Sequence, residues 1–236
     1  MKALFYGTVL QFRLDIRSKS MLITCYLVPL VFFLFMGGIF TSVDPTAAKT
    51  LISSMTVFTI TMSALMGLPP ALAEIYGTDV KKVYKANGAP IWFGVVTQFI
   101  SSFIHTFIVC LIIFAISPPV FKAELPVNLL WYFLSLTALL AVTLAIGCIF
   151  GLMIKQQAKL TMAAMIIFLP SIMLSGIMFP TEMLPEFMQY IAYAFPATIA
   201  FKAMTNFEVW QIPVLLGIFV LLCGVVFVLL KFKVKR

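Results

Sequence analysis

The sequence predicts an all-α, polytopic membrane protein with six transmembrane helices, an N-terminal interfacial helix and re-entrant external helices between spans five and six. Its 236 residues are 63% hydrophobic and only 10% charged, a balance typical of membrane proteins rather than of soluble domains. A helix needs about 20 apolar residues to cross a bilayer. Six apolar stretches approach or exceed that length: Met21–Phe40, Leu51–Ala73, Ile91–Ile116, Leu129–Ile154, Leu160–Phe179 and Ile212–Leu230.

Basic residues alternate between the connections that join these stretches. Thirteen lie in the N-terminal segment, residues 74–90, residues 155–159 and the C-terminal segment: Lys2, Arg13, Arg17, Lys19, Lys81, Lys82, Lys85, Lys155, Lys159, Lys231, Lys233, Lys235 and Arg236. The other connections hold only three, Lys49, Lys122 and Lys202. Because cytoplasmic loops carry an excess of Lys and Arg, this asymmetry predicts that both termini are cytoplasmic.

The positive charge also limits the partners that we expect. The formal net charge is +8, but the basic residues are spread over four segments on one side of the membrane and do not form one patch. We therefore expect contact with anionic membrane lipids and no binding of nucleic acid. The six spans use most of the chain, so residues 1–236 are predicted to form a single transmembrane domain.

Residues 1–19 are predicted to form an interfacial helix along the inner leaflet. Phe5, Val9, Phe12 and Ile16 fall within a narrow arc of a helical wheel, which is typical of a helix that lies in the membrane surface. The alternative is a loosely ordered basic tail.

Residues 74–90 are predicted to form a cytoplasmic connection that carries a short helix. Span two is expected to end at Pro69-Pro70 or one turn later, because the two prolines remove backbone donors. After the breaker Gly77, Thr78 can cap a helix that runs to Lys85, with its lysines on one face. Such a helix suits docking to a cytoplasmic protein, and the alternative is a solvated turn.

Residues 180–211 are too polar for a simple span and too apolar for a solvated loop. Pro180, Pro185 and Pro196 divide this segment, which predicts short helices that dip into the outer leaflet as a re-entrant segment. A seventh span over Phe187–Phe201 is the alternative. Lys202 and the need to keep the basic C-terminus inside argue against it.

The sequence holds no recognisable catalytic or metal-binding motif. It has no P-loop, no H-E-x-x-H and no G-x-S-x-G, so we assign no catalytic and no metal-ligating residue. His105 lies in the middle of span three and is interpreted as an imidazole that bonds to a neighbouring helix, with a functional role as the alternative. The four cysteines are interpreted as small buried hydrophobes. Without a nucleotide motif, the protein would draw energy from a partner or be passive.

Two segments resemble the type-2 ABC exporter permease family. The stretch Ser175–Thr198 resembles the family signature that follows span five, in which a small-residue pair precedes F-P and further prolines follow. The matching positions are Gly176, Phe179, Pro180, Pro185 and Pro196. A second match, E-x-x-G-T at Glu74, Gly77 and Thr78, is similar to the turn that opens the coupling helix of the family. Pro90 comes several residues later than the proline usual in the family.

The resemblance implies that the chain is the permease subunit of an ATP-driven exporter in a bacterial or archaeal plasma membrane. It implies a separate cytoplasmic ABC ATPase that holds ATP and Mg²⁺, so this chain itself binds no cofactor and is not an enzyme, and a second permease in a homodimer or heterodimer. The substrate would be a drug, a peptide antibiotic or a lipid-linked molecule. The implied ATPase-coupling residues are Glu74, Gly77, Thr78, Lys81, Lys82 and Lys85, and the resemblance places an external gate at the signature that contains Gly176 and Pro196.

Two other classes of function stay open at this point. A membrane-embedded enzyme that modifies lipids would need clustered acid, base or nucleophilic residues, and the only close external pair of carboxylates is Glu182 and Glu186. A passive channel would need a defined pore. The apolar walls of spans two and five favour a hydrophobic or amphipathic substrate for an exporter.

Overall fold

The computed structural model describes residues 2–43, 45–77, 88, 90–178 and 181–235. These residues are helical apart from short turns and connections, and they contain six helices that are long and apolar enough to span a membrane. The all-α prediction with six spans is therefore confirmed. The spans are Lys19–Val43, Leu51–Gly77, α7 (Trp92–Phe121), α8 (Leu129–Met153), α9 (Gln157–Leu174) and α12 (Gln211–Lys235).

Spans one and two each contain a π-helical turn. Span one consists of α2 (Lys19–Leu22), the π-helix η1 (Ile23–Leu27) and α3 (Val28–Val43). Span two consists of α4 (Leu51–Met62), the π-helix η3 (Ser63–Gly67) and α5 (Leu68–Gly77). The remaining short elements are α1 (Lys2–Arg17), the 3₁₀-helices η2 (Pro45–Lys49) and η4 (Thr181–Met183), α10 (Glu186–Ala192) and α11 (Pro196–Thr205).

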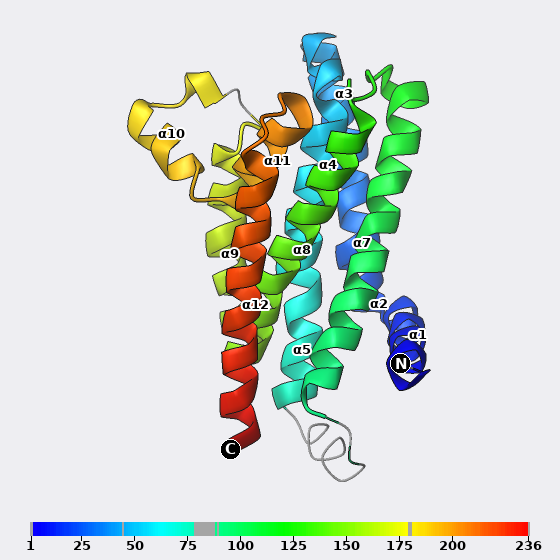
Figure 1. The fold of residues 1–236 in the computed structure, drawn as a ribbon. Helices are drawn as coiled ribbons and strands as arrows, with labels where there is room; N and C mark the ends of the chain where they lie inside the picture. The colour runs from blue at the N-terminus through cyan, green and yellow to red at the C-terminus, as the bar shows by residue number, and fades with distance from the viewer. Residues whose placement is uncertain (1, 44, 78–87, 89, 179–180, 236) are drawn as a thin grey trace.

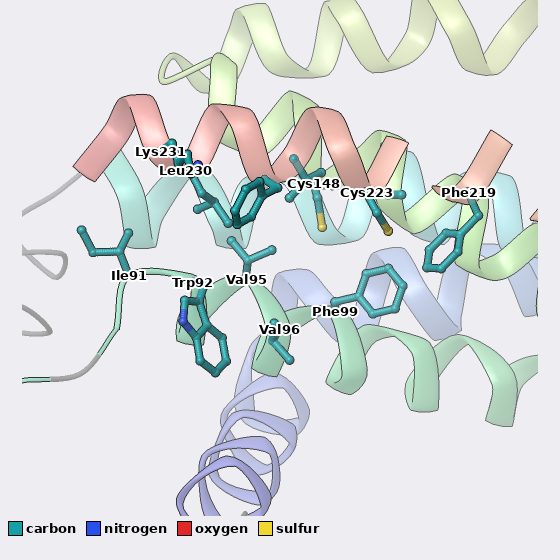
Figure 2. Close-up of a pocket in the computed structure, with 13 residues that line it drawn as sticks. Ile91, Trp92, Val95, Val96, Phe99, Cys148, Phe219, Cys223, Leu230 and Lys231 are labelled. Carbon is teal, nitrogen blue, oxygen red and sulfur yellow. The ribbon is translucent and has the colours of Figure 1, made fainter. Parts of the chain in front are cut away.

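The two ends of the bundle differ in the segments that lie there. Figure 1 shows both ends of the chain, the last turn of α5 and the first turn of α7 at one end, and α10 and α11 at the other. The helix α1 lies beside α7 and crosses it steeply at the end that holds both termini (Figures 1 and 2). We call this end the basic end, because it carries the clusters of Lys and Arg near both termini.

Span two forms the centre of the fold. Of its most apolar window, 89% of the residues are buried, because α7, α8, α9 and α11 surround it. Two of its buried hydroxyl groups find partners inside the bundle: Thr56 Oγ1 lies 2.7 Å from the Tyr132 hydroxyl of α8, and Thr61 donates to the Val57 carbonyl. A place for span two in the wall of a substrate path stays a prediction: most of the span is enclosed, and residues between Met66 and Gly77 border a pocket.

Two glycines of α8 allow span two to pack closely. A Cβ atom at Gly147 would collide with the carbonyl oxygen of Ala64, and one at Gly151 would lie 2.7 Å from the Cβ atom of Leu72. These positions therefore need glycine, as in other close contacts between membrane helices. The G-x-x-x-G pair forms the seam between α8 and span two.

Two predicted helix ends are wrong, and both involve proline pairs. Span two continues through Pro69-Pro70 to Gly77, about two helical turns later. The π-helical turn η3 directly precedes this pair, and such local adjustments accommodate backbone groups that proline leaves without a partner. Likewise α7 passes through Pro118 and Pro119 and ends at Phe121, five residues beyond the predicted end at Ile116.

The segment between spans five and six forms two short helices. The α10 helix contacts α9, whereas α11 packs against α8 and α4 and buries Thr198, Ala200 and Ala203. A turn between them interrupts the alternative seventh span. Insertion of these helices into the outer leaflet stays a prediction.

The cysteines follow the sequence interpretation only in part. Cys25, Cys110 and Cys148 are buried, as expected, but Cys223 is exposed. Cys223 lies on α12, the span with the least buried surface, where only 6% of the most apolar window is buried. Its exposure follows from its position on a helix that contacts the rest of the bundle along one side.

Candidate functional site

A buried carboxylate attaches α1 to α7 at the basic end. The Asp15 side chain is only 5% exposed. Ser101 Oγ donates to Asp15 Oδ2 at 2.5 Å, and Gln98 Nε2 donates to the same oxygen at 3.2 Å. Gln11 Nε2, one turn earlier on α1, donates to Asp15 Oδ1 at 3.0 Å. Hydrogen bonds to a charged acceptor are strong and offset the cost of burying it, so this cluster holds α1 in a defined place.

His105 continues the contact one turn further along α7. Its Nδ1 lies 2.6 Å from the Tyr26 hydroxyl of span one, which confirms the interpretation of His105 as a group that bonds to a neighbouring helix. Its ring also stacks on Phe12 of α1, with centroids 4.2 Å apart and an interplanar angle of 6°. A second set of contacts therefore joins α1, span one and span three.

Sequence reasoning missed the carboxylate cluster. No role was assigned to Asp15, Gln98 or Ser101 from the sequence. One signal was available: Gln98, Ser101 and His105 recur at helical spacing on one face of an otherwise apolar span. Their partner could not be found from spacing, because Asp15 is more than 80 positions away in the chain.

A polar pocket of about 450 Å³ opens beside this cluster. It lies between the junction of α1 and α2, the end of α5 and the start of α9. Two residues from the predicted coupling motif, Glu74 and Gly77, line it together with Asp15, Lys155 and Gln157. The end of span two and the buried carboxylate of α1 therefore face a common cavity.

Tyr76 bonds the end of α5 to the start of α7, on the two sides of the connection between these helices. Its side chain is 3% exposed, and its hydroxyl donates to the carbonyl of Ile91 and accepts a 3.1 Å bond from the Val95 amide. The last turn of α5 is thereby bonded to the first turns of α7. Tyr76 lies inside the E-x-x-G-T motif, between Glu74 and Gly77, yet its role was not predicted because it depends on the position of α7.

The predicted coupling residues are only partly described. Glu74 and Gly77 occupy the last turn of α5. Thr78, Lys81, Lys82 and Lys85, and with them the predicted helix from Thr78 to Lys85, lie outside the described residues. On the far side of the connection, Gly88 has φ +67°, a conformation that favours glycine.

Residues of the external signature lie at helix boundaries. Gly176 follows the C-cap of α9 with φ +86°, and a Cβ atom there would lie 3.1 Å from Thr181 Cγ2. Pro185 is the N-cap of α10, and Pro196 is the first residue of α11, where proline is well tolerated. Phe179 and Pro180 lie outside the described residues. The signature thus defines the turns between spans five and six, and its role as a gate stays a prediction.

The contacts of this site join helices to one another. Within the described part of the chain, no group of three or more His, Cys, Asp or Glu side chains is placed to hold a metal ion. The contacts instead link α1, α5 and α7, so that a displacement of one of these helices would be passed to the others.

Comparison with known proteins identifies a family. The family model described as ABC-2 type transporter matches residues 3–209. The matched region starts in α1, contains both motifs and ends just before α12. No curated protein and no solved structure matches the chain.

Proposed function

We propose, from the premise that this chain belongs to the ABC-2 type transporter family, that it is the permease subunit of an ATP-driven exporter. The chain is a multi-pass membrane protein and a membrane component of an ABC transporter. The proposal adds that a separate cytoplasmic ATPase supplies the energy, that two permeases pair, and that the basic end faces the cytoplasm in a bacterial or archaeal cell.

One structural observation supports the proposed coupling to an ATPase in addition to the family match. The helix α1, the end of α5 and the start of α7 are joined by the Asp15 cluster and by Tyr76 at the basic end. The connection 78–87, which carries Lys81, Lys82 and Lys85, leaves from this unit. An ATPase that pushes on the connection would therefore move α5 and α7 together, and α1 with them, in a rigid-body step.

The surface of α9 supports a hydrophobic or amphipathic substrate. Its exposed side carries Met162, Met165, Ile166, Leu169 and Met173. Methionine adapts to apolar surfaces of varied shape, and α9 leads directly into the external signature. We propose that this face, with the outer half of span one, lines the path between two permeases.

Affinity purification in mild detergent tests the energy source. The tagged chain should recover a P-loop ATPase in stoichiometric amount. The variant Lys81→Glu/Lys82→Glu/Lys85→Glu should lose it, whereas Lys231→Gln, a charge change on α12 at the same end, should retain it. Recovery of the chain alone after cross-linking, or full transport by the triple variant, would contradict the proposal and favour a passive channel or a lipid-modifying enzyme.

A further inference from the structure

We propose that a groove between α7 and α12 binds one phospholipid of the surrounding bilayer, with an anionic headgroup at Lys231 and an acyl chain along α8. The groove has a volume of about 570 Å³. It lies on a different side of α7 from Ser101 and His105, and it does not include the predicted coupling or gate residues.

The shape of the groove fits a single extended chain. The helices α7 and α12 line the groove from two sides (Figure 2), and Ala145 and Cys148 of α8 complete its lining. At one end the rings of Phe99 and Phe219 approach to 6.3 Å between centroids and close it. Apart from Lys231, every lining side chain is aliphatic, aromatic or a cysteine. Such a lining offers an acyl chain a dry surface and offers nothing to a polar ligand.

The length of the groove matches one leaflet. From Phe219 to Lys231, α12 advances about 18 Å at 1.5 Å per residue. One half of a hydrocarbon core of about 30 Å is about 15 Å. The groove therefore has the length that an acyl chain spans within one leaflet.

Charge and aromatic residues gather at the basic end of the groove. Lys231 Nζ lies 4.9 Å from the centroid of the Phe227 ring, so its stem follows the wall while its ammonium group stays at the rim. Trp92 lies at the same end with 48% of its surface exposed. Lysine and tryptophan are typical of the membrane–water interface. A phosphate at this rim would be paired with Lys231, the one charged residue among the described residues of the lining.

Fluorescence of Trp92 provides a direct test. The double variant Trp131→Phe/Trp210→Phe leaves Trp92 as the single tryptophan of the chain. The delipidated protein in mild detergent would be titrated with phosphatidylglycerol or phosphatidylcholine that carry identical brominated chains, which quench nearby tryptophan. We expect quenching that saturates at one lipid per polypeptide. Half-saturation should need about fivefold less phosphatidylglycerol than phosphatidylcholine, which is the preference that the attraction of one lysine for an anionic headgroup gives.

Two substitutions, each with a matched control, test binding of the lipid headgroup and binding of the acyl chain separately. Lys231→Gln should abolish the fivefold preference, whereas Lys155→Gln, a lysine at the same end that lines the polar pocket, should keep it. Cys223→Phe fills the groove and should remove saturable quenching by both lipids. Val220→Phe, on the open side of the same helix with 70% exposure, should not. Cys223→Leu, a smaller change, provides a partial block if the phenylalanine variant does not fold.

Specific outcomes would overturn the proposal. Equal half-saturation for the two lipids, or an unchanged preference in Lys231→Gln, would refute the headgroup assignment. Quenching that rises without saturation, or that survives both Cys223 variants, would refute the groove as a binding site. These measurements need no ATPase and no transport, so they do not depend on the proposed function.

Discussion

Ser101 of α7 donates a 2.5 Å hydrogen bond to the carboxylate of Asp15 on α1, and this contact joins α1 to the bundle. A helix that lies on a membrane by its apolar side alone can slide along it. A buried carboxylate with three side-chain donors fixes α1 against one position on span three.

Asp15→Ala should release α1 from α7. The donors of Ser101 and Gln98 would lose their acceptor, and an unsatisfied buried group costs about 1–3 kcal/mol. We expect faster tryptic cleavage at Arg13 and Arg17, by severalfold, and a lower thermal midpoint. Gln11→Ala removes the more peripheral donor and should have a smaller effect. Unchanged cleavage in Asp15→Ala would show that the cluster does not hold α1.

Tyr76→Phe should loosen the joint between α5 and α7. The carbonyl of Ile91 and the amide of Val95 would lose their shared partner, at a cost of about 1–3 kcal/mol. Hydrogen exchange measured by mass spectrometry should accelerate at the start of α7. Tyr190→Phe, a residue of α10 with 79% exposure, is the matched control. Equal protection at Val95 in both variants would argue against the joint.

Gly147→Ala and Gly151→Ala should each destabilise the chain by about 1–3 kcal/mol, because a methyl group would overlap the backbone of span two. Gly217→Ala and Gly224→Ala on α12 make the same change where a Cβ atom meets nothing within 4 Å. Unfolding in detergent, followed by circular dichroism, compares the two pairs. Similar stabilities for all four variants would mean that α8 and span two are not in close contact.

His105→Ala should reduce stability without abolishing transport per folded molecule. It leaves the Tyr26 hydroxyl unpaired and removes the ring that stacks on Phe12. A double-mutant cycle with Tyr26→Phe isolates the hydrogen bond, and we expect a coupling energy of about 1 kcal/mol. Complete loss of transport by a well-expressed, assembled His105→Ala protein would instead identify a functional histidine.

The sequence indicated the glycines and prolines at helix boundaries but not the residues that join different helices. Gly176, Pro185 and Pro196 mark helix boundaries in the structure, because glycine and proline act on their own backbone and so reveal local structure. Asp15 and Tyr76 were missed, because their roles come from partners on another helix. The end of span two was predicted too early at the prolines 69–70 for a related reason. The surrounding bundle and a π-helical turn accommodate them within the helix.

The sequence by itself determined the number of spans, the all-α class and the separation of the basic residues, because the bilayer imposes length, polarity and charge asymmetry on each segment alone. Only the tertiary structure decided which helix is central, which carboxylate is buried and where α7 and α12 leave a groove. Those features depend on which faces of distant helices meet. Nearly uniform apolarity along a span hides that information, because lipid and helix neighbours accept the same side chains.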